Sequence, residues 1–355
     1  MGVTVTQRSK SSPSFQMPAE WYPHRQTWMA WPFDDSMWFG QLAEVRQEYA
    51  TLVKAISQAE PVQLFVRDEE AAASAASHLA SVSGVTLHQR PLDDVWMRDS
   101  GPTFLHSEEE GQGSSLVCGN WRFNAWGEKY DWLNDDKVPE YVASILGMER
   151  VDINLVMEGG SLEVDGRGLC LTTEQCLLSP NRNPTLAKDD VEVALQHYLG
   201  VNQVIWLRQG LEGDHTDGHI DTITRFSHPG VVLTSVTDDT EDPNYDTMLE
   251  NLEILRTLRL ENGDRLAVIE LPLPRTKAFL EDGTRLPSTY ANFYIANGLV
   301  VVPQYDDPHD QKALAIVTKA FPHHRVVGLM SRHIIKGGGS FHCLTQQQPE
   351  GGITR

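Results

Sequence analysis

Cys343 is the first candidate for chemistry, because it follows three glycines at 337–339 in a polar segment near the end of the sequence. Glycine lets a backbone approach a ligand closely and adopt unusual dihedral angles. A cysteine on such a loop is a better nucleophile candidate than one inside a strand. The other cysteines lie within or just beyond apolar runs and are expected to be small core residues: Cys118, Cys170 and Cys176.

His219 and Asp221 form a second candidate group, separated by one residue at the expected start of a strand. Side chains at i and i+2 of a strand point to the same face. A histidine beside a carboxylate is held in orientation and keeps its proton to higher pH. We therefore interpret His219 as an acid and base that delivers a proton to a departing amine.

Asp99 and Glu158 are carboxylates in loops beside glycines, within the segments WMRDSGP and MEGGS. A guanidinium group is planar and presents five N–H donors, which carboxylates bind through paired, charge-assisted hydrogen bonds. Together with Asp221 these residues are expected to form a cage for a planar cation.

Zinc is the alternative for the third loop, because His215, His219 and Asp221 offer ligand atoms within the segment HTDGHID. Zinc-binding pairs of this spacing need both histidines on one helical face, whereas Gly218 and the turn-rich surroundings disfavour a helix. We expect no metal. Loss of activity in chelator would favour zinc, and inactivation by iodoacetamide would favour the thiol.

Tryptophans are concentrated near these loops, at Trp21, Trp28, Trp31, Trp96, Trp121 and Trp126. They are either core residues or the walls of an apolar channel that closes over a cation. Trp96 is the preferred candidate for such a wall.

The elements that must position these residues recur five times along the chain as helix, strand, loop and hairpin. Helices are expected near 41–58, 69–82, 137–147, 185–199, 244–258 and 309–321. One reactive side chain follows the first strand of each unit: Asp99, Glu158, His219, Asn292 and Cys343. Radial repetition would bring the five loops to one face. The fifth unit lacks its own hairpin, and residues 27–31 are expected to supply a strand that closes the ring.

Composition is that of a globular protein, with 40% hydrophobic and 22% charged residues in 355. The repeats favour a single domain over 1–355, with a flexible N-terminus at 1–16. Forty-nine acidic against 29 basic residues give a formal net charge of −20, which disfavours nucleic acid and anionic membranes and suits a cationic substrate. Without an export signal or membrane span, and with only four cysteines, a cytoplasmic protein is expected.

The chain resembles the agmatine deiminase and bacterial-type peptidylarginine deiminase family of the guanidine-modifying pentein superfamily. The motifs that carry the resemblance run almost end to end: MPAEWYPHRQTWMAWP, DDVWMRDSGP, NWRFNAWG, MEGGSLEVDGRG, TDGHIDTITRF, YANFYIANGLVVVPQYDD and GGGSFHCLTQQ. The resemblance implies a five-bladed α/β propeller (pentein fold) of ββαβ modules around a central active site.

The resemblance also implies site roles: Cys343 as nucleophile, His219 as general acid and base, and Asp99, Glu158 and Asp221 as guanidinium-binding carboxylates. Asn292 then lies close to the reacting centre, and Trp96 lines the site. The implied reaction is hydrolytic deimination through a covalent S-alkylthiouronium, without a cofactor.

Agmatine is the favoured substrate and N-carbamoylputrescine the favoured product, because a second cation suits an acidic protein. Glu212 and Asp214 are candidates for binding its far amine. The alternatives are free or peptidyl arginine as substrate, amidino transfer, and a catalytically silent guanidine-binding protein. The sequence is compatible with a homo-oligomer.

Overall fold

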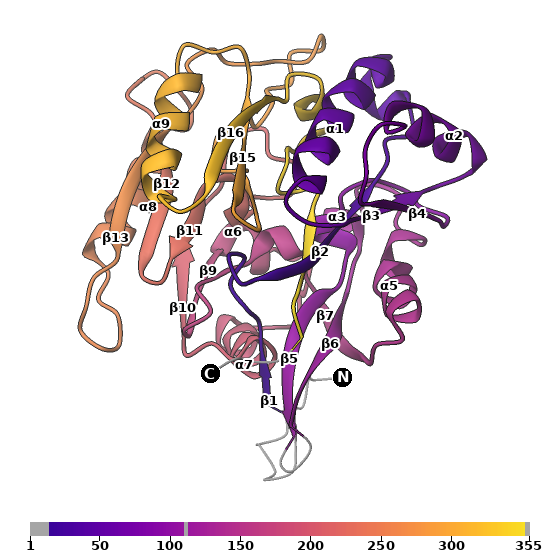
Figure 1. Ribbon diagram of the computed structural model, residues 1–355. Helices are drawn as coiled ribbons and strands as arrows, with labels where there is room; N and C mark the ends of the chain where they lie inside the picture. Colours follow the sequence, from indigo (N-terminus) through magenta and orange to yellow (C-terminus); the bar gives the residue numbers. More distant parts are fainter. Residues whose placement is uncertain (1–13, 110–112, 352–355) are drawn as a thin grey trace.

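In the computed structural model, which describes residues 14–109 and 113–351, the strands form five sheets. Every sheet contains an antiparallel pair whose second strand pairs in parallel with the strand that follows the next long helix. Figure 1 shows the sheets arranged around a common centre, with helices such as α1, α5 and α9 on the outside. This arrangement confirms the predicted five-module propeller of the pentein type.

Four of the sheets follow one another along the chain. The first consists of β1 (Ser14–Gln16), β5 (Thr103–Glu109), β6 (Gly113–Arg122) and β7 (Arg150–Val156), with α5 (Val138–Leu146) connecting the last two. The second consists of β8 (Glu163–Val164), β9 (Leu169–Thr173) and β10 (Gln203–Leu207), with α7 (Lys188–Leu199) connecting the last two. The third consists of β11 (Thr224–His228), β12 (Val231–Val236) and β13 (Ala267–Pro272), with α8 (Tyr245–Thr257) connecting the last two. The fourth consists of β14 (Tyr294–Ala296), β15 (Leu299–Gln304) and β16 (Arg325–Met330), with α9 (Asp310–Ala320) connecting the last two.

The fifth sheet joins the two ends of the chain. It consists of β17 (Gln346–Pro349), β2 (His24–Ala30), β3 (Val62–Val66) and β4 (Val85–Gln89). Helix α1 (Leu42–Ser57) connects β2 with β3, and helix α2 (Glu69–His78) connects β3 with β4. Strand β17 pairs antiparallel with β2, with Gln346 opposite Trp28. The predicted strand at 27–31 therefore closes the ring, and its partner is the last strand of the chain.

The N-terminal segment differs in part from the prediction of a flexible end at 1–16. Residues 1–13 lie outside the described part of the chain, while Ser14–Gln16 form strand β1. This strand pairs antiparallel with β5, and Phe15 is buried against the second core cluster. Burial of Phe15 and of Met17, which directly follows the strand, helps to hold this short edge strand against the sheet.

Apolar periodicity explains how the helices cover the sheets. Helix α1 buries Val45, Tyr49, Leu52 and Ile56, whose spacing of three or four residues lines one helical face. The buried apolar residues form four clusters, one of which contains α1 together with β2 and β3. Among the described residues, no helix is both long and apolar enough to cross a bilayer.

Short helical turns occupy many of the connections between strands. They are α3 (Met97–Ser100), α4 (Ala125–Glu128), α6 (Glu174–Leu177), η1 (Ser36–Trp38), η2 (Asp135–Lys137), η3 (Gly159–Ser161), η4 (Ile220–Thr222) and η5 (Ile334–Gly337). Four of them, α3, η3, η4 and η5, lie in segments that join one sheet to the next. Three of them, α3, η3 and η4, begin at or contain a predicted site residue. Contacts between α3 and η3, and between η3 and η4, bring these segments together.

Candidate active site

The predicted site residues lie in the segments that connect the last strand of one sheet with the first strand of the next. Asp99 precedes β5, Glu158 precedes β8, His219 precedes β11, Asn292 precedes β14 and Cys343 precedes β17. Because the sheets are arranged radially, the five connections meet at the centre (Figure 1). Each side chain is thus contributed by a different junction of the ring.

Cys343 is 3% exposed and lies against an amide and a carboxylate. Asn292 Nδ2 is 3.2 Å from its Sγ, and Asp221 Oδ2 is 3.5 Å from the same sulfur. The backbone N–H of Cys343 donates to Asn292 Oδ1, which fixes the cysteine backbone relative to that side chain. Burial, reinforced by the charges of Asp221 and Asp99, raises the pKa of the Cys343 thiol well above its usual value.

His219 is fully buried between two carboxylates. Its Nδ1 lies 3.7 Å from Asp99 Oδ1, and its Nε2 lies 3.7 Å from Glu158 Oε2. Neither ring nitrogen makes a hydrogen bond within the described residues. Burial by itself lowers the pKa of His219, but the charge of Asp99 and the polar interactions with Cys176 and Glu158 outweigh that effect and raise the pKa well above the usual value.

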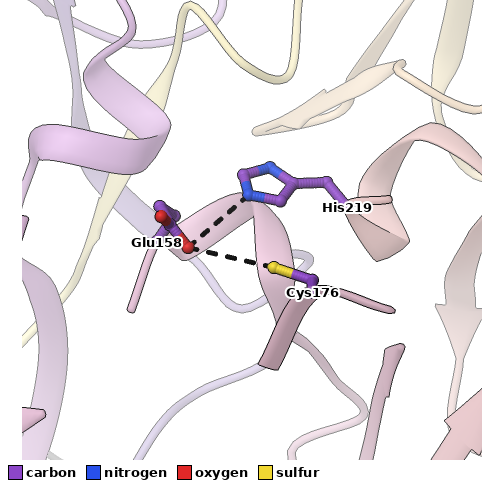
Figure 2. Close-up of side chains that lie close together, drawn as sticks. All are labelled: Glu158, Cys176 and His219. Atoms are coloured by element: carbon purple, nitrogen blue, oxygen red, sulfur yellow. Dashed lines mark hydrogen bonds and ion pairs between the residues drawn. The ribbon is translucent and has the colours of Figure 1, made fainter. Parts of the chain in front are cut away.

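Glu158 is held by a buried arginine on its other side. Arg182 Nε donates to Glu158 Oε1 at 2.6 Å, while Cys176 Sγ lies 3.9 Å from Oε2. Figure 2 shows His219 and Cys176 approaching the same carboxylate from different elements. Burial raises the pKa of Glu158, but His219 and Arg182 lower it by more. The net pKa is therefore below the usual value, and the carboxylate stays ionised to lower pH.

Asp99 is oriented by two donors and remains the most easily protonated carboxylate of the group. Trp126 Nε1 donates to Oδ2 at 2.9 Å, and the N–H of Gly160 donates to Oδ1 at 2.9 Å. Burial raises its pKa to about 6, even though the positive charge of His219 acts in the opposite direction.

Gly160 lies where the imidazole of His219 and the carboxylates of Asp99 and Asp221 are closely packed. A Cβ at this position would lie 2.5 Å from His219 Nδ1, 2.8 Å from Asp99 Oδ1 and 3.1 Å from Asp221 Oδ2. These distances leave no room for a side chain. The close approach therefore requires glycine at 160.

A cavity of about 320 Å³ connects this cluster with the surface. Cys343 and Asp99 lie in its lining, together with the aromatic rings of Trp96 and Trp126. Its size is at the lower end for small-molecule sites, and its wall is largely apolar with a few charged groups. The cavity therefore suits a small ligand with a methylene chain and a cationic end at the buried group.

The sequence predicted that Asp221 and His219 point to the same face of a strand. This prediction is wrong. Thr222 Oγ1 and the Thr222 N–H both bond to the His219 carbonyl, and the chain turns into η4. Because this turn advances by roughly 120° per residue, side chains two apart point in different directions. His219 faces Asp99 and Glu158, whereas Asp221 Oδ2 accepts from His342 at 2.7 Å.

Comparison with known proteins gives the family. The model of the Porphyromonas-type peptidyl-arginine deiminase family matches residues 16–349. The agmatine deiminase of Ectopseudomonas mendocina is 39% identical, over 98% of both chains. The chain belongs to this deiminase family.

Solved structures support the same relationship. The agmatine deiminase of Enterococcus faecalis superposes with a TM-score of 0.88 at 32% identity, over 97% of this chain and 100% of that one. A cysteine-to-serine agmatine deiminase from C. jejuni with substrate bound superposes with a TM-score of 0.88 at 29% identity, over 98% of this chain and 100% of that one. The fold of this deiminase-family chain is therefore shared with these enzymes over almost its whole length.

Glu212 and Asp214 are not among the residues that line the cavity of this deiminase-family chain. Glu212 is exposed, and Asp214 is used within its own loop. Asp214 Oδ1 accepts from Thr216, and Oδ2 accepts from the N–H of His219 at 3.2 Å. The carboxylate of Asp214 thus shapes the turn that carries His219.

The zinc arrangement is also not assembled within the described part of the deiminase-family chain. His215 lies at the cavity wall, where its Nδ1 is 2.9 Å from the Tyr130 hydroxyl. Two groups bring three ligand-type atoms within 4.8 Å of one another: Glu158, Cys176 and His219, and Glu20, Glu163 and His342. Neither contains His215, and each already includes a carboxylate bonded to a buried arginine.

Several residues of this deiminase site escaped sequence reasoning. Arg182 and His342 bond to predicted carboxylates, and Asp94 lines the cavity. Trp126 was expected as a core residue or a channel wall, but its bond to Asp99 was not foreseen. The sequence signal was weak for Arg182, which lies in an irregular segment. It was stronger for Asp94 and His342, which stand within two motifs that we had singled out.

Proposed function

We propose that this chain hydrolyses the guanidinium group of agmatine, giving N-carbamoylputrescine and ammonia, with Cys343 as the nucleophile. The single observation that carries the proposal is the convergence of a buried thiol, a histidine and three carboxylates in one cluster, of which Cys343 and Asp99 line the cavity and His219, Glu158 and Asp221 lie behind them. The names of the relatives support agmatine as the substrate. The whole chain, 1–355, is proposed to act as one catalytic domain in the cytoplasm, where a nucleophilic thiol stays reduced.

In the first step the Cys343 sulfur bonds to the central guanidinium carbon while the carboxylates hold the flanking nitrogens. The thiol proton passes to solvent as the cation binds. His219 then gives its proton to one terminal nitrogen, the bond from carbon to that nitrogen breaks, and ammonia leaves. An S-alkylthiouronium remains on Cys343.

In the second step His219, now neutral, accepts a proton from water while the resulting hydroxide adds to the same carbon. The carbon–sulfur bond breaks, and the sulfur leaves as thiolate. Loss of one proton to solvent gives the neutral ureido product, and ammonia takes up a proton there. The steps use side chains of the chain and water alone.

The electrostatic environment favours ionisation of the thiol in the complex over the free enzyme. Burial and the nearby carboxylates raise the pKa of Cys343 well above its usual value. A guanidinium ion placed among Asp99, Glu158 and Asp221 neutralises part of that negative field, so the thiolate becomes more favourable when the substrate is present. The bound substrate thus favours the thiolate form of the cysteine that attacks it.

Asp94 is the residue that we propose for the far ammonium of agmatine. It lines the same cavity as Cys343, and its backbone N–H is held by the buried carboxylate of Asp135. Within the described ranges, no Lys or Arg nitrogen lies within 4.0 Å of its carboxylate. Burial raises the pKa of Asp94 to about 7, and a bound ammonium would restore its charge.

Arginine is the second candidate substrate, and one observation favours it. Lys336 also lines the cavity, with its Nζ donating to Gln41 Oε1 at 2.6 Å. A lysine there is able to pair with the carboxylate of free arginine. The two candidates thus depend on residues of opposite charge.

The test of the reaction is a colorimetric ureido assay on agmatine, free arginine and a peptidyl arginine. Agmatine is expected to give the highest kcat/KM. Cys343→Ala is expected to lower it by about 10⁴-fold or more, because no other group replaces the sulfur. Cys118→Ala, which changes a buried thiol in the first core cluster, is the matched control and should retain activity. Full activity of Cys343→Ala would refute the proposal.

The test of tail recognition compares agmatine with n-butylguanidine, which lacks the terminal amine. Asp94→Asn is expected to raise the KM for agmatine by about 10- to 100-fold and to leave n-butylguanidine nearly unchanged. Lys336→Gln should leave agmatine turnover intact. If Lys336→Gln instead reduces a dominant arginine activity, arginine is the substrate and Asp94 has a different role.

A further inference from the structure

A chain of buried charged residues extends behind the candidate site, and the mechanism above uses only its last member. It consists of Glu163, Arg225, Glu20, His342 and Asp221. All five side chains are no more than 5% exposed. Buried charges are costly to desolvate unless each one is paired, so an unbroken series of pairs at this place calls for a reason.

His342 is the link between this chain and the candidate site. Its Nδ1 is 2.7 Å from Asp221 Oδ2, and its Nε2 is 2.8 Å from Glu20 Oε2. Its backbone N–H donates to Asn292 Oδ1, and the next residue is Cys343. The imidazole is therefore fixed at both nitrogens and through its backbone.

Two ionised carboxylates can only accept hydrogen bonds, so a ring that bonds to both must carry a proton on each nitrogen. Both carboxylates are strongly favoured in the ionised form. Burial raises the pKa of Glu20, but Arg225 and His342 hold it far below its usual range. Burial likewise raises the pKa of Asp221, and His342 lowers it by more.

Arg225 explains why Glu20 is available to His342. Its Nε donates to Glu163 Oε2 at 2.8 Å, and its Nη2 donates to Glu20 Oε2 at 2.5 Å. The remaining oxygen of Glu20 accepts the N–H of Ile295 at 2.7 Å. Glu20 is thus anchored to two sheets before it meets the imidazole.

As a result, one carboxylate oxygen of Asp221 accepts a hydrogen bond and the other does not. Oδ2 is bonded to His342, while Oδ1 is buried and has no hydrogen-bond partner among the described residues. An unpartnered buried acceptor is costly, and a guanidinium N–H would satisfy it. The imidazole fixes the rotation that leaves Oδ1 free.

We propose that His342 is a positioning residue: an imidazolium, clamped between Glu20 and Asp221, that keeps Asp221 ionised and turns its free oxygen towards the guanidinium. The role in binding rests on the proposed function, but the protonation state of His342 does not. Other charged groups close to this chain are Arg98, whose Nη2 lies 3.9 Å from Glu20 Oε2, and His219, whose charge also acts on Asp221.

The protonation state is tested on the unmodified protein by nitrogen NMR of histidine labelled with ¹⁵N at both ring positions. The His342 signals, assigned by their loss in His342→Gln, are expected to show two protonated nitrogens at neutral pH, as the contacts of both ring nitrogens with carboxylates require. A ring with one unprotonated nitrogen at neutral pH would overturn the proposal, whatever the substrate of the enzyme.

The functional consequence is tested through the pH dependence of kcat/KM for agmatine. Without the imidazolium, burial is left as the largest influence on Asp221, so its pKa should rise above that of Asp99, which is about 6, and the ionised form of Asp221 is lost at a higher pH. In His342→Gln the acidic limb should therefore move to higher pH by about one unit or more, with the increase in KM exceeding the decrease in kcat. Glu20→Gln should move it in the same direction by a smaller amount.

Glu60→Gln is the matched control, because Glu60 forms another buried carboxylate–histidine pair, with His24 Nδ1 3.0 Å from Oε1. It should lower the melting temperature without moving the acidic limb. If His342→Gln and Glu20→Gln also lower only stability or only kcat, with the limb unmoved, the positioning role is wrong. If the wild-type protein does not turn over agmatine, the proposed function fails and the NMR result still decides the state of His342.

Discussion

Asp99 is the site carboxylate whose charge is most sensitive to pH. Burial raises its pKa to about 6 from an ordinary value of 3.8. A carboxyl group whose pKa is raised on folding binds its proton more tightly in the folded state, so it favours folding at acidic pH and opposes it above about pH 6. A bound guanidinium reverses the preference, because the cation requires the ionised form.

Because the cation requires ionised Asp99, binding of agmatine should weaken as the pH falls. Agmatine should raise the melting temperature of the inactive Cys343→Ala chain strongly at about pH 8, and this increase should decline as the pH falls through about 6. Thermal unfolding with and without agmatine measures the effect. n-Butylguanidine should show the same decline, since Asp99 is proposed to bind the guanidinium end. An increase that stays constant from about pH 8 to 5 contradicts the account.

Residue types in the sequence predicted much of the site. The contacts between residues far apart in the sequence could not be predicted. Cys343, His219 and the carboxylates stand beside glycines in turn-rich segments, which is visible in the sequence. The partners of those carboxylates are not visible, because Arg182 and His342 reach them only through the tertiary fold. Asp214 misled the prediction since a carboxylate in a turn often bonds to its own backbone.

At the scale of elements, short helical turns replace the strand starts that the sequence suggested. The segment HIDTITRF was expected to be a strand from its start, but its apolar residues recur at every third position, at Ile220, Ile223 and Phe226, and do not alternate. The first residues of that segment instead form η4, because Gly218 adopts a φ of +87° and the Thr222 hydroxyl bonds back to the His219 carbonyl. A local side-chain bond of this kind competes with the sheet ladder and redirects the site residues.

Element η3 yields a prediction because it approaches the site through backbone alone. Gly160→Ala would place a methyl group 2.5 Å from His219 Nδ1, which forces His219 or the turn to move. A displacement of about 1 Å is expected to lower kcat/KM about 100-fold. Gly351→Ala, whose Cβ meets nothing within 4 Å, is the control. Wild-type kinetics in Gly160→Ala would show that the turn does not confine these groups.

At the scale of the molecule, the repeat explains why the architecture was predictable. Each module repeats an antiparallel pair, a helix and a parallel strand, and the six expected helices lie within a few residues of their observed bounds. The identity of the closing partner was not predictable, because β17 follows Cys343 closely and its glutamines carry no strand signal. Its pairing with β2 depends on the ring as a whole.

Ring closure gives the prediction at this scale. A chain that ends at Thr345 loses β17 and leaves β2 as an unpaired edge beside the Cys343 segment. It is expected to melt at a clearly lower temperature and to lose deiminase activity, although every proposed catalytic residue is retained. Circular dichroism and the ureido assay measure both effects. A chain that ends at Gly351 keeps β17 and should behave like the full chain; equal behaviour of both truncations contradicts a role for closure.

The central claim is that the sulfur of Cys343 carries the substrate carbon during turnover. The most direct measurement is acid quenching of the enzyme during turnover of agmatine labelled with ¹⁴C at the guanidinium carbon, followed by peptide mapping. The account predicts label on the peptide that contains Cys343, and none on the same peptide in Cys343→Ala. Label on Cys176 or on any other side chain, or rapid ureido formation with no enzyme-bound label at any time, would contradict it.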